Sequence, residues 1–111
     1  MATAQTVINQ KGPLPITAAF EALSDAQALI MLSGSVWSNT SNESIGIQIA
    51  VDGTVIGTAS IFANPATTHM SVVPIVIPYT FGFSGHKVTL SAATGNTVGD
   101  QNDYYMVTIL Y

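Results

Sequence analysis

The sequence predicts an all-β fold, an antiparallel β-sandwich of the jelly-roll type with about eight strands. Two observations support this class. Apolar and polar residues alternate with a period of two, and turn-forming residues interrupt the alternation at intervals of about eight to twelve positions. The 111 residues suit one domain, which we expect to span 1–111 without a linker or an internal repeat.

The N-terminal third predicts three strands separated by turns. We expect these strands near 6–9, 14–22 and 27–37. An alternative is a helix over 18–29, because this segment is rich in helix formers and Ser24 with Gln27 resembles a capping box. Both of those polar residues would lie on the stripe that the helix buries, so we favour two strands that turn at Ser24 and Asp25.

The clearest local unit is a β-hairpin over 45–62. Its first strand alternates isoleucine or valine with small or polar residues, which is typical of a strand with one buried face. Asp52 and Gly53 supply a two-residue turn, because glycine accepts a positive φ at little cost and aspartate tolerates one. Uninterrupted pairing from this turn sets Ile49 against Ile56 and places Ile56 in the core. A three-residue loop with a glycine bulge, the alternative, would shift the register by one residue.

The C-terminal half predicts three more strands. We interpret 71–80 as an edge strand, because Pro74 and Pro78 lie four positions apart and remove N–H donors from the same side. Residues 86–92 alternate cleanly and predict a strand with one buried face. The strand over 104–111 is apolar on both faces, so we expect a second layer to cover the face that its own core does not.

Charged residues make up only 7% of the chain, against about 25% in an average protein. The two lysines and six acidic residues give a net charge of −4, which excludes a phosphate-binding surface and hence nucleic acid as a partner. Without cysteine there is no disulfide or zinc–thiolate site. No apolar run suits a membrane span and no signal-peptide pattern is present, so we expect no membrane insertion and a cytoplasmic or virion-associated location.

The scarcity of charge predicts self-association. An 11.6 kDa monomer should expose roughly 5,800 Å², and eight charged residues cannot cover that surface. A contiguous apolar patch larger than a few hundred Å² normally marks an interface. We therefore expect an obligate homo-oligomer with apolar contacts between copies, to which the strand over 104–111 contributes. The alternative is a monomer with an unusually apolar surface.

Two segments carry a resemblance to known proteins. The apolar final strand Tyr104-Tyr105-Met106-Val107-Thr108-Ile109-Leu110-Tyr111, within a compact jelly-roll pattern, resembles the trimeric domains of the tumour-necrosis-factor/C1q type. The segment Gly85-His86-Lys87-Val88-Thr89-Leu90 is similar to a Gly-His-x-Val-x-Leu strand of small jelly-roll proteins from bacteria and their phages. The resemblance covers about 14–111 and implies a homotrimer that binds at surfaces and has no catalytic activity.

Two loops offer the groups that sugar binding uses, an aromatic face beside amide or carboxylate hydrogen-bonding groups. One follows the predicted strand that ends at 37, and the other precedes the strand that begins at 104. The ligand-binding candidates are Trp37, Asn39, Asn42, Asp100, Asn102 and Tyr104. The alternative interpretation is that the tryptophan caps the core and the polar residues form solvated loops.

Candidates for metal binding and catalysis are few. Asp100, Asn102 and Asp103 could offer oxygen ligands to calcium, although such residues are first of all turn formers. We predict no other cofactor. His69 and His86 are the two histidines, and a small hydrolase that pairs one of them with a nearby acid is the enzymatic alternative. The segment 82–86 departs from the Gly-x-Ser-x-Gly nucleophile motif, so we interpret it as a turn.

Together these patterns predict a non-enzymatic β-sandwich that forms a homo-oligomer, with a trimer favoured. We expect it to act as a binding or structural module that recognises a glycan on a cell surface, where several weak sites in one oligomer strengthen binding. A purely architectural component of an assembly is the alternative without a ligand.

Overall fold

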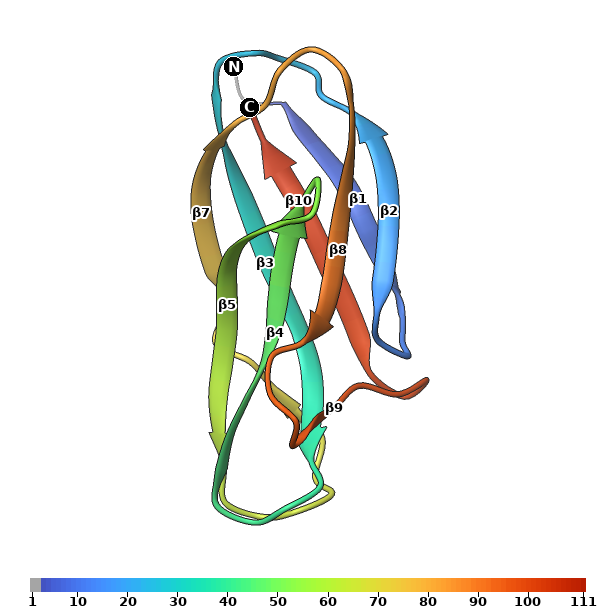
Figure 1. Ribbon diagram of the computed structural model, residues 1–111, viewed down its shortest axis with the longest axis vertical. Coiled ribbons are helices and arrows are strands. Elements are labelled where there is room, and N and C mark those ends of the chain that lie inside the picture. Colours follow the sequence, from blue (N-terminus) through green and yellow to red (C-terminus); the bar gives the residue numbers. More distant parts are fainter. Residues whose placement is uncertain (1–2) are drawn as a thin grey trace.

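The computed structural model describes residues 3–111, and these form two antiparallel β-sheets packed face to face (Figure 1). No helix occurs in this part of the chain, and hence none that could cross a membrane. The strands are β1 (Ala4–Lys11), β2 (Ile16–Glu21), β3 (Gln27–Ser38), β4 (Glu43–Val51), β5 (Thr54–Ala63), β6 (Met70–Ser71), β7 (Ile75–Thr80), β8 (Gly85–Ala92), β9 (Thr97–Val98) and β10 (Tyr104–Leu110).

The eight long strands follow the jelly-roll order. One sheet, the β3 sheet, has the order β1-β10-β3-β7, and the other, the β4 sheet, has the order β2-β8-β4-β5. The short strands β6 and β9 pair with the last residues of β3. Successive long strands alternate between the two sheets, except within the β4–β5 hairpin. The predicted all-β jelly-roll sandwich is therefore confirmed.

Alternate residues of each strand fill the core between the sheets. On β3, Ala28, Ile30 and Leu32 are buried, whereas Leu29 and Met31 between them are exposed. This alternation is the period-two pattern seen in the sequence, and it explains why the segment forms a strand. The alternative helix over 18–29 does not form, because these residues pair with β7, β8 and β10 as strands of the two sheets.

The turn of the β4–β5 hairpin has the predicted form, but the register beyond it was predicted wrongly. Asp52 and Gly53 both adopt a positive φ, 50° and 85°, as a type I′ turn requires. Past the turn, Val51 pairs with Thr54 and Ala50 with Val55, and a bulge at Ile56 in β5 then sets Ile49 against Gly57, where we predicted Ile56. The register is therefore shifted by one residue, but by this bulge and not by the three-residue loop of the alternative.

Contact between the two sheets explains this register. A Cβ atom at Gly57 would lie 2.7 Å from Cδ1 of Ile77 on β7, so any larger residue where β5 and β7 approach would require the end of this isoleucine to move. Ile56 is displaced from the inward row and is half-buried beside the core. The position of β7, which the hairpin sequence does not contain, therefore sets the pairing of the hairpin.

The strand predicted over 71–80 is divided in two. Its first part is β6, its second is β7, and Val72 is buried between them before Pro74 interrupts the pairing. In the part of the chain that the structure describes, β7 pairs with β3 alone and so lies at a sheet edge. The edge position predicted from Pro74 and Pro78 is confirmed.

The final strand β10 lies in the middle of the β3 sheet, between β1 and β3. Tyr105, Val107 and Ile109 point into the core and are fully buried. Tyr104 and Met106 point outward and are exposed, so no segment within residues 3–111 covers the second apolar face that we expected to be covered.

We predict that Gly46→Ala destabilises the fold by about 1–3 kcal/mol. A Cβ atom at Gly46 would lie 2.5 Å from the carbonyl oxygen of Ala59, and backbone atoms of a paired strand cannot move away easily. Urea unfolding measures this change. The matched control is Gly95→Ala, since no heavy atom lies within 4 Å of its added methyl group. Equal stability of the two variants would contradict the close approach at Gly46.

Candidate functional site

Both histidines of the chain contact aspartates, and they do so in two separate places. His69 meets Asp100 and Asp103 where β3 ends and β10 begins. His86 meets Asp52 beside the turn between β4 and β5. We name the first group the His69 cluster and the second the His86 pair.

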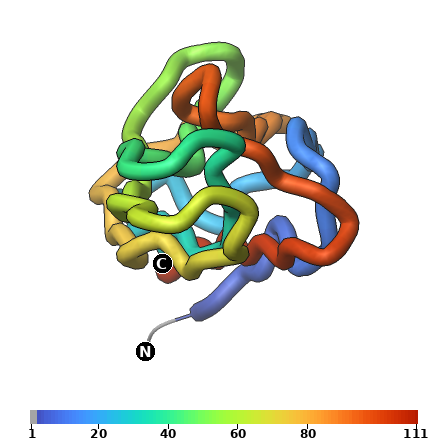
Figure 2. The backbone as a smooth tube through the Cα atoms, turned by 90° about the horizontal axis from the view of Figure 1, so that it is seen from below, coloured from blue at the N-terminus to red at the C-terminus, as the bar shows by residue number. Residues whose placement is uncertain are grey.

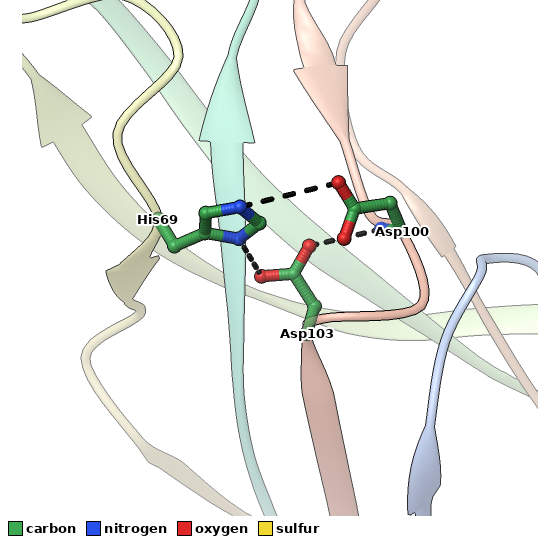
Figure 3. Close-up of side chains that lie close together, drawn as sticks. All are labelled: His69, Asp100 and Asp103. Atoms are coloured by element: carbon green, nitrogen blue, oxygen red, sulfur yellow. Dashed lines mark hydrogen bonds and ion pairs between the residues drawn. The ribbon is translucent and has the colours of Figure 1, made fainter.

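Two segments of the chain build the His69 cluster (Figure 3). His69 immediately precedes β6, Asp103 immediately precedes β10, and Asp100 lies in the connection between β9 and β10. Nδ1 of His69 donates to Oδ1 of Asp103 at 2.7 Å, and Nε2 lies 4.0 Å from Oδ2 of Asp100. The imidazole therefore faces one carboxylate with each nitrogen.

The turn that carries both aspartates is held by its own side chains. The N–H of Asp100 donates to Oδ2 of Asp103 at 2.9 Å, and the N–H of Asn102 donates to Oδ1 of Asp100 at 2.8 Å. Asparagine and aspartate favour turns because they accept such bonds from nearby backbone groups. The local sequence thus holds two carboxylates side by side before β10 begins.

Asp103 is a fully buried carboxylate, at 0% exposure, and its partners satisfy it. Ser35 Oγ donates to Oδ1 at 2.7 Å, in addition to the bonds from His69 and the Asp100 N–H. A buried charge is costly unless it is paired and hydrogen-bonded in this way. The bond to Asp103 is also the main reason that the pKa of His69 is raised above its ordinary value, with a smaller contribution from the charge of Asp100.

Trp37 extends the cluster. Its Nε1–H donates to Oδ2 of Asp100 at 2.9 Å, and its ring centroid lies 6.2 Å from that of His69. The N–H of Asn102 is the largest influence holding the pKa of Asp100 below its ordinary value, and the Trp37 bond and the charge of His69 act in the same direction. An indole, an imidazole and an ionised carboxylate therefore lie together, with Asp100 and His69 partly exposed.

The structure joins three of the six predicted ligand residues by hydrogen bonds, and a fourth lies next to them in the chain. Trp37 and Asn102 both donate to Asp100, and Tyr104 follows Asp103 with its side chain exposed. The other two, Asn39 and Asn42, lie in the connection between β3 and β4 at the same end of the sandwich (Figure 2).

The backbone N–H groups of Asn39 and Asn42 donate to neighbouring loops. Asn39 bonds to the carbonyl of Asn96, and Asn42 bonds to the carbonyl of Asn64. Among the hydrogen bonds of residues 3–111, none joins these two asparagines to the His69 cluster. Their placement fits loop-to-loop contacts better than a shared site with Trp37.

Two residues of the cluster were not predicted to bond to Asp103. His69 was named only for the enzymatic alternative, with no acid assigned to it, and Ser35 was not among the candidates. The hydrogen bonds of these two residues to Asp103 span 34 and 68 positions, respectively, so the local sequence pattern could not predict them. Only the pairing of β3 with β6 and β10 brings the three residues together.

The donor set of the cluster differs from the one expected for calcium. Calcium takes six to eight oxygen ligands, whereas this group offers one imidazole and two carboxylates. Three hydrogen bonds already occupy the carboxylate of Asp103. The composition of the cluster suits a transition metal better than calcium, and calcium binding stays a prediction.

In the His86 pair the imidazole is less exposed than in the His69 cluster, at 10% against 40%. Nδ1 of His86 donates to Oδ2 of Asp52 at 2.6 Å, and Nε2 donates to the carbonyl of Gly82 at 2.7 Å. The ring packs against those of Phe20 and Phe81, with centroids 5.7 and 5.2 Å away, and these two phenylalanine rings also contact each other. Because both nitrogens face acceptors, the geometry fits an imidazolium, and these bonds, the one to Gly82 first, raise the pKa of His86.

A serine lies near each histidine, which bears on the enzymatic alternative. Ser84 Oγ is 3.4 Å from Nε2 of His86, so these two residues and Asp52 stand in the order of a Ser-His-Asp triad. Nε2 donates its hydrogen to the carbonyl of Gly82, however. A protonated Nε2 has no lone pair with which to accept the proton of the serine hydroxyl. At the other histidine, Ser35 donates to the carboxylate instead of to the imidazole. Neither serine is activated in this arrangement.

Two cavities adjoin these groups. One of about 510 Å³ lies beside the His86 pair and is lined by Phe20, Glu21 and Lys87 among others. Another, of about 340 Å³, adjoins the His69 cluster at Ser35 and Tyr104. Both fall within the size range of small-ligand sites. The first is larger, but the second is lined by serines and Tyr104 and lies next to Ser35, whose hydroxyl donates to the buried carboxylate of the His69 cluster. It is the better candidate for a ligand with many hydroxyl groups.

No protein-family model matches the chain, and no curated protein matches it in sequence. Among solved structures, the sugar-binding C-terminal domain of EclA is similar at a TM-score of 0.47 and 14% identity, covering 98% of this chain and 76% of that one. The carbohydrate-binding module CBM36, in complex with calcium and xylotriose, is similar at 0.47 and 9%, covering 98% and 87%. Likeness at this level carries no information about the ligand of this chain.

We predict that stability falls as the pH rises from 6 to 9. A pKa that is raised in the folded state means that folding favours the protonated imidazole, so its contribution is complete below the ordinary value of 6.5. That contribution is lost as the pH rises through the folded value. Urea unfolding at several pH values measures the slope.

The variant His86→Gln separates the two histidines. We expect it to be less stable than the wild type at pH 6 and to show a flatter slope, while the slope that remains belongs to His69, whose pKa is also raised. The matched variant is His69→Gln. A wild-type stability that is constant, or that increases between pH 6 and 9, would show that neither imidazolium stabilises the fold.

Proposed function

We propose that this chain is a non-enzymatic binding module that works as a homo-oligomer, with a trimer favoured, and binds a glycan at the His69 cluster. One observation carries the proposal. The outer face of the β3 sheet is apolar and exposed, and the three strands β3, β7 and β10 contain no charged residue. We name this surface the apolar face.

The apolar face is continuous across the sheet. In the strand register, Met31 lies between Thr108 and Val76, and Leu29 lies between Leu110 and Pro78. Of the ten large hydrophobic residues that are exposed within residues 3–111, five belong to this one surface. They are Leu29, Met31, Val76, Tyr104 and Met106.

The charge of the molecule lies elsewhere. Lys11 of the edge strand β1 pairs with Tyr104 at the margin of the apolar face, whereas β2 and β8 of the opposite sheet carry Glu21 and Lys87. Apolar surface gains about 25 cal/mol for each Å² removed from water. A second copy that covers this face would remove apolar area without burying an unpaired charge, which is the composition of a self-association surface.

The number of copies is proposed from the resemblance of the final strand to domains of the tumour-necrosis-factor/C1q type. That strand, β10, supplies Tyr104 and Met106 to the apolar face. Cyclic symmetry closes an assembly of identical copies and leaves none of the faces open. Three copies joined in this way would present three His69 clusters, so that a weak single site is strengthened by multivalency.

The groups at the His69 cluster support a glycan as ligand. Sugars are recognised by a planar ring beside charged hydrogen-bonding groups, and Trp37, His69 and Asp100 offer that set. A cavity of about 340 Å³ adjoins the cluster through Ser35, which donates to Asp103. The alternative that the apolar face supports equally is an architectural component of an assembly with no ligand.

We predict that the double substitution Met31→Lys with Val76→Lys converts the oligomer to monomers. Two ammonium groups placed on the apolar face would lose their hydration on contact with a second copy. Native mass measurement at micromolar concentration gives the number of copies. The matched control is Val55→Lys, an exposed valine on edge strand β5 of the other sheet, which should leave the assembly intact. A wild-type protein that is monomeric at 100 μM would refute the oligomer.

We predict that Asp100→Asn weakens glycan binding by about tenfold or more, because a hydrogen bond to a charged group is worth roughly 1.5–3 kcal/mol. An oligosaccharide array finds the ligand, and titration with the best oligosaccharide measures its affinity. The control is Asp25→Asn, a substitution of an exposed aspartate in the turn between β2 and β3. Silence of the array for an intact oligomer would favour the architectural alternative.

A further inference from the structure

We propose that the His69 cluster binds a divalent transition-metal ion of the Zn²⁺ or Ni²⁺ class. Nε2 of His69 and Oδ2 of Asp100 are the protein ligands, and Asp103 is the carboxylate that orients the imidazole. This metal site deepens the proposed function by naming an ion at the same end of the sandwich, but it does not require that a glycan binds.

The orientation of His69 is the first support. Asp103 is completely buried and is held by Ser35 and by the N–H of Asp100, so its position is set before any ligand arrives. It accepts the Nδ1–H of His69 at 2.7 Å, which directs the lone pair of a neutral imidazole to Nε2. Histidines that bind metal ions usually donate their other ring N–H to a carboxylate or carbonyl in this way.

The distances are the second support. Nε2 of His69 lies 4.0 Å from Oδ2 of Asp100, and one ligand atom from each of the three residues lies within 4.8 Å of the others (Figure 3). Bonds of about 2.0–2.2 Å place two ligands of one zinc ion about 3–3.5 Å apart. A closure of less than about 1 Å therefore brings Nε2 and Oδ2 to bonding distance.

Exposure allows that closure and leaves room for further ligands. The side chains of His69 and Asp100 are 40% and 35% exposed, and both residues lie in connections outside the long strands. Trp37 donates to Oδ2 of Asp100 and so limits the directions in which this carboxylate can turn. Two protein ligands leave two or more coordination positions for water or for hydroxyl groups of a bound molecule.

The chemistry of the donors selects the class of ion. Imidazole suits zinc, nickel and copper, whereas calcium prefers a set made of oxygens alone. The two aspartates bring negative charge to a neutral imidazole, and a divalent cation compensates that charge.

Calorimetric titration tests the proposal. The full chain is treated with a chelator, dialysed, and titrated with the chloride salts of Zn²⁺, Ni²⁺ and Ca²⁺ at pH 7.5. We expect about one Zn²⁺ or Ni²⁺ ion per chain, and an affinity for both that exceeds the affinity for Ca²⁺. His69→Ala and Asp100→Asn should each weaken binding at least tenfold, whereas His86→Gln, which changes the other histidine, should bind as the wild type does.

A second measurement keeps the result interpretable. Long-range ¹H–¹⁵N NMR of the imidazoles should show the Nε2 resonance of His69 shift on addition of Zn²⁺ while Nδ1 stays protonated. The proposal is wrong if no heat appears up to 1 mM metal, if His69→Ala binds Zn²⁺ as tightly as the wild type, or if Ca²⁺ binds more tightly than Zn²⁺. Oligomeric state and the oligosaccharide array, each measured with chelator present, report on the proposed function separately.

Discussion

The burial of one row of side chains from every long strand between two sheets is the constraint on which the other features depend. Because the strands alternate between sheets, the fit of each inner row is decided by strands that are distant in sequence. Gly57 shows the consequence, since the approach of Ile77 from the other sheet shifts the hairpin register by one residue. Gly34 is a second case, because a Cβ atom there would lie within 3 Å of Tyr105, Ile47 and the Tyr104 carbonyl.

The same constraint leads to the His69 cluster. Pairing of β3 with β6 and β10 places Ser35, His69 and Asp103 together, and a carboxylate that is buried there must be satisfied by its neighbours. Asp103 therefore joins three segments of the chain and at the same time fixes the orientation of an exposed imidazole. A requirement of folding, the pairing of a buried charge, thus creates the arrangement that a ligand or metal ion can use.

The two outer surfaces of the sandwich differ in the charged residues that they carry. The β4 sheet carries charged residues on β2, β4 and β8, whereas in the β3 sheet only edge strand β1 carries one, Lys11. Three of the eight charged residues lie on strands of the β4 sheet and four lie in turns and connections, so the strands of the β3 sheet keep only Lys11. The proposed self-association follows from this division. The proposed binding site adjoins the same face, because Tyr104 and Met106 of the apolar face also line the cavity of about 340 Å³ beside Ser35.

Local sequence was sufficient to predict the all-β class, the strands, the Asp52-Gly53 turn and the edge position of β7, because alternation, turn preference and missing N–H groups act over a few residues. It was also sufficient to place Trp37 and Asp100 among the candidates. It could not predict the pairing of Ile49 with Gly57, nor the bond between His69 and Asp103 across 34 positions. Those features depend on which strands become neighbours in the two sheets. The local sequence around each residue does not determine that arrangement.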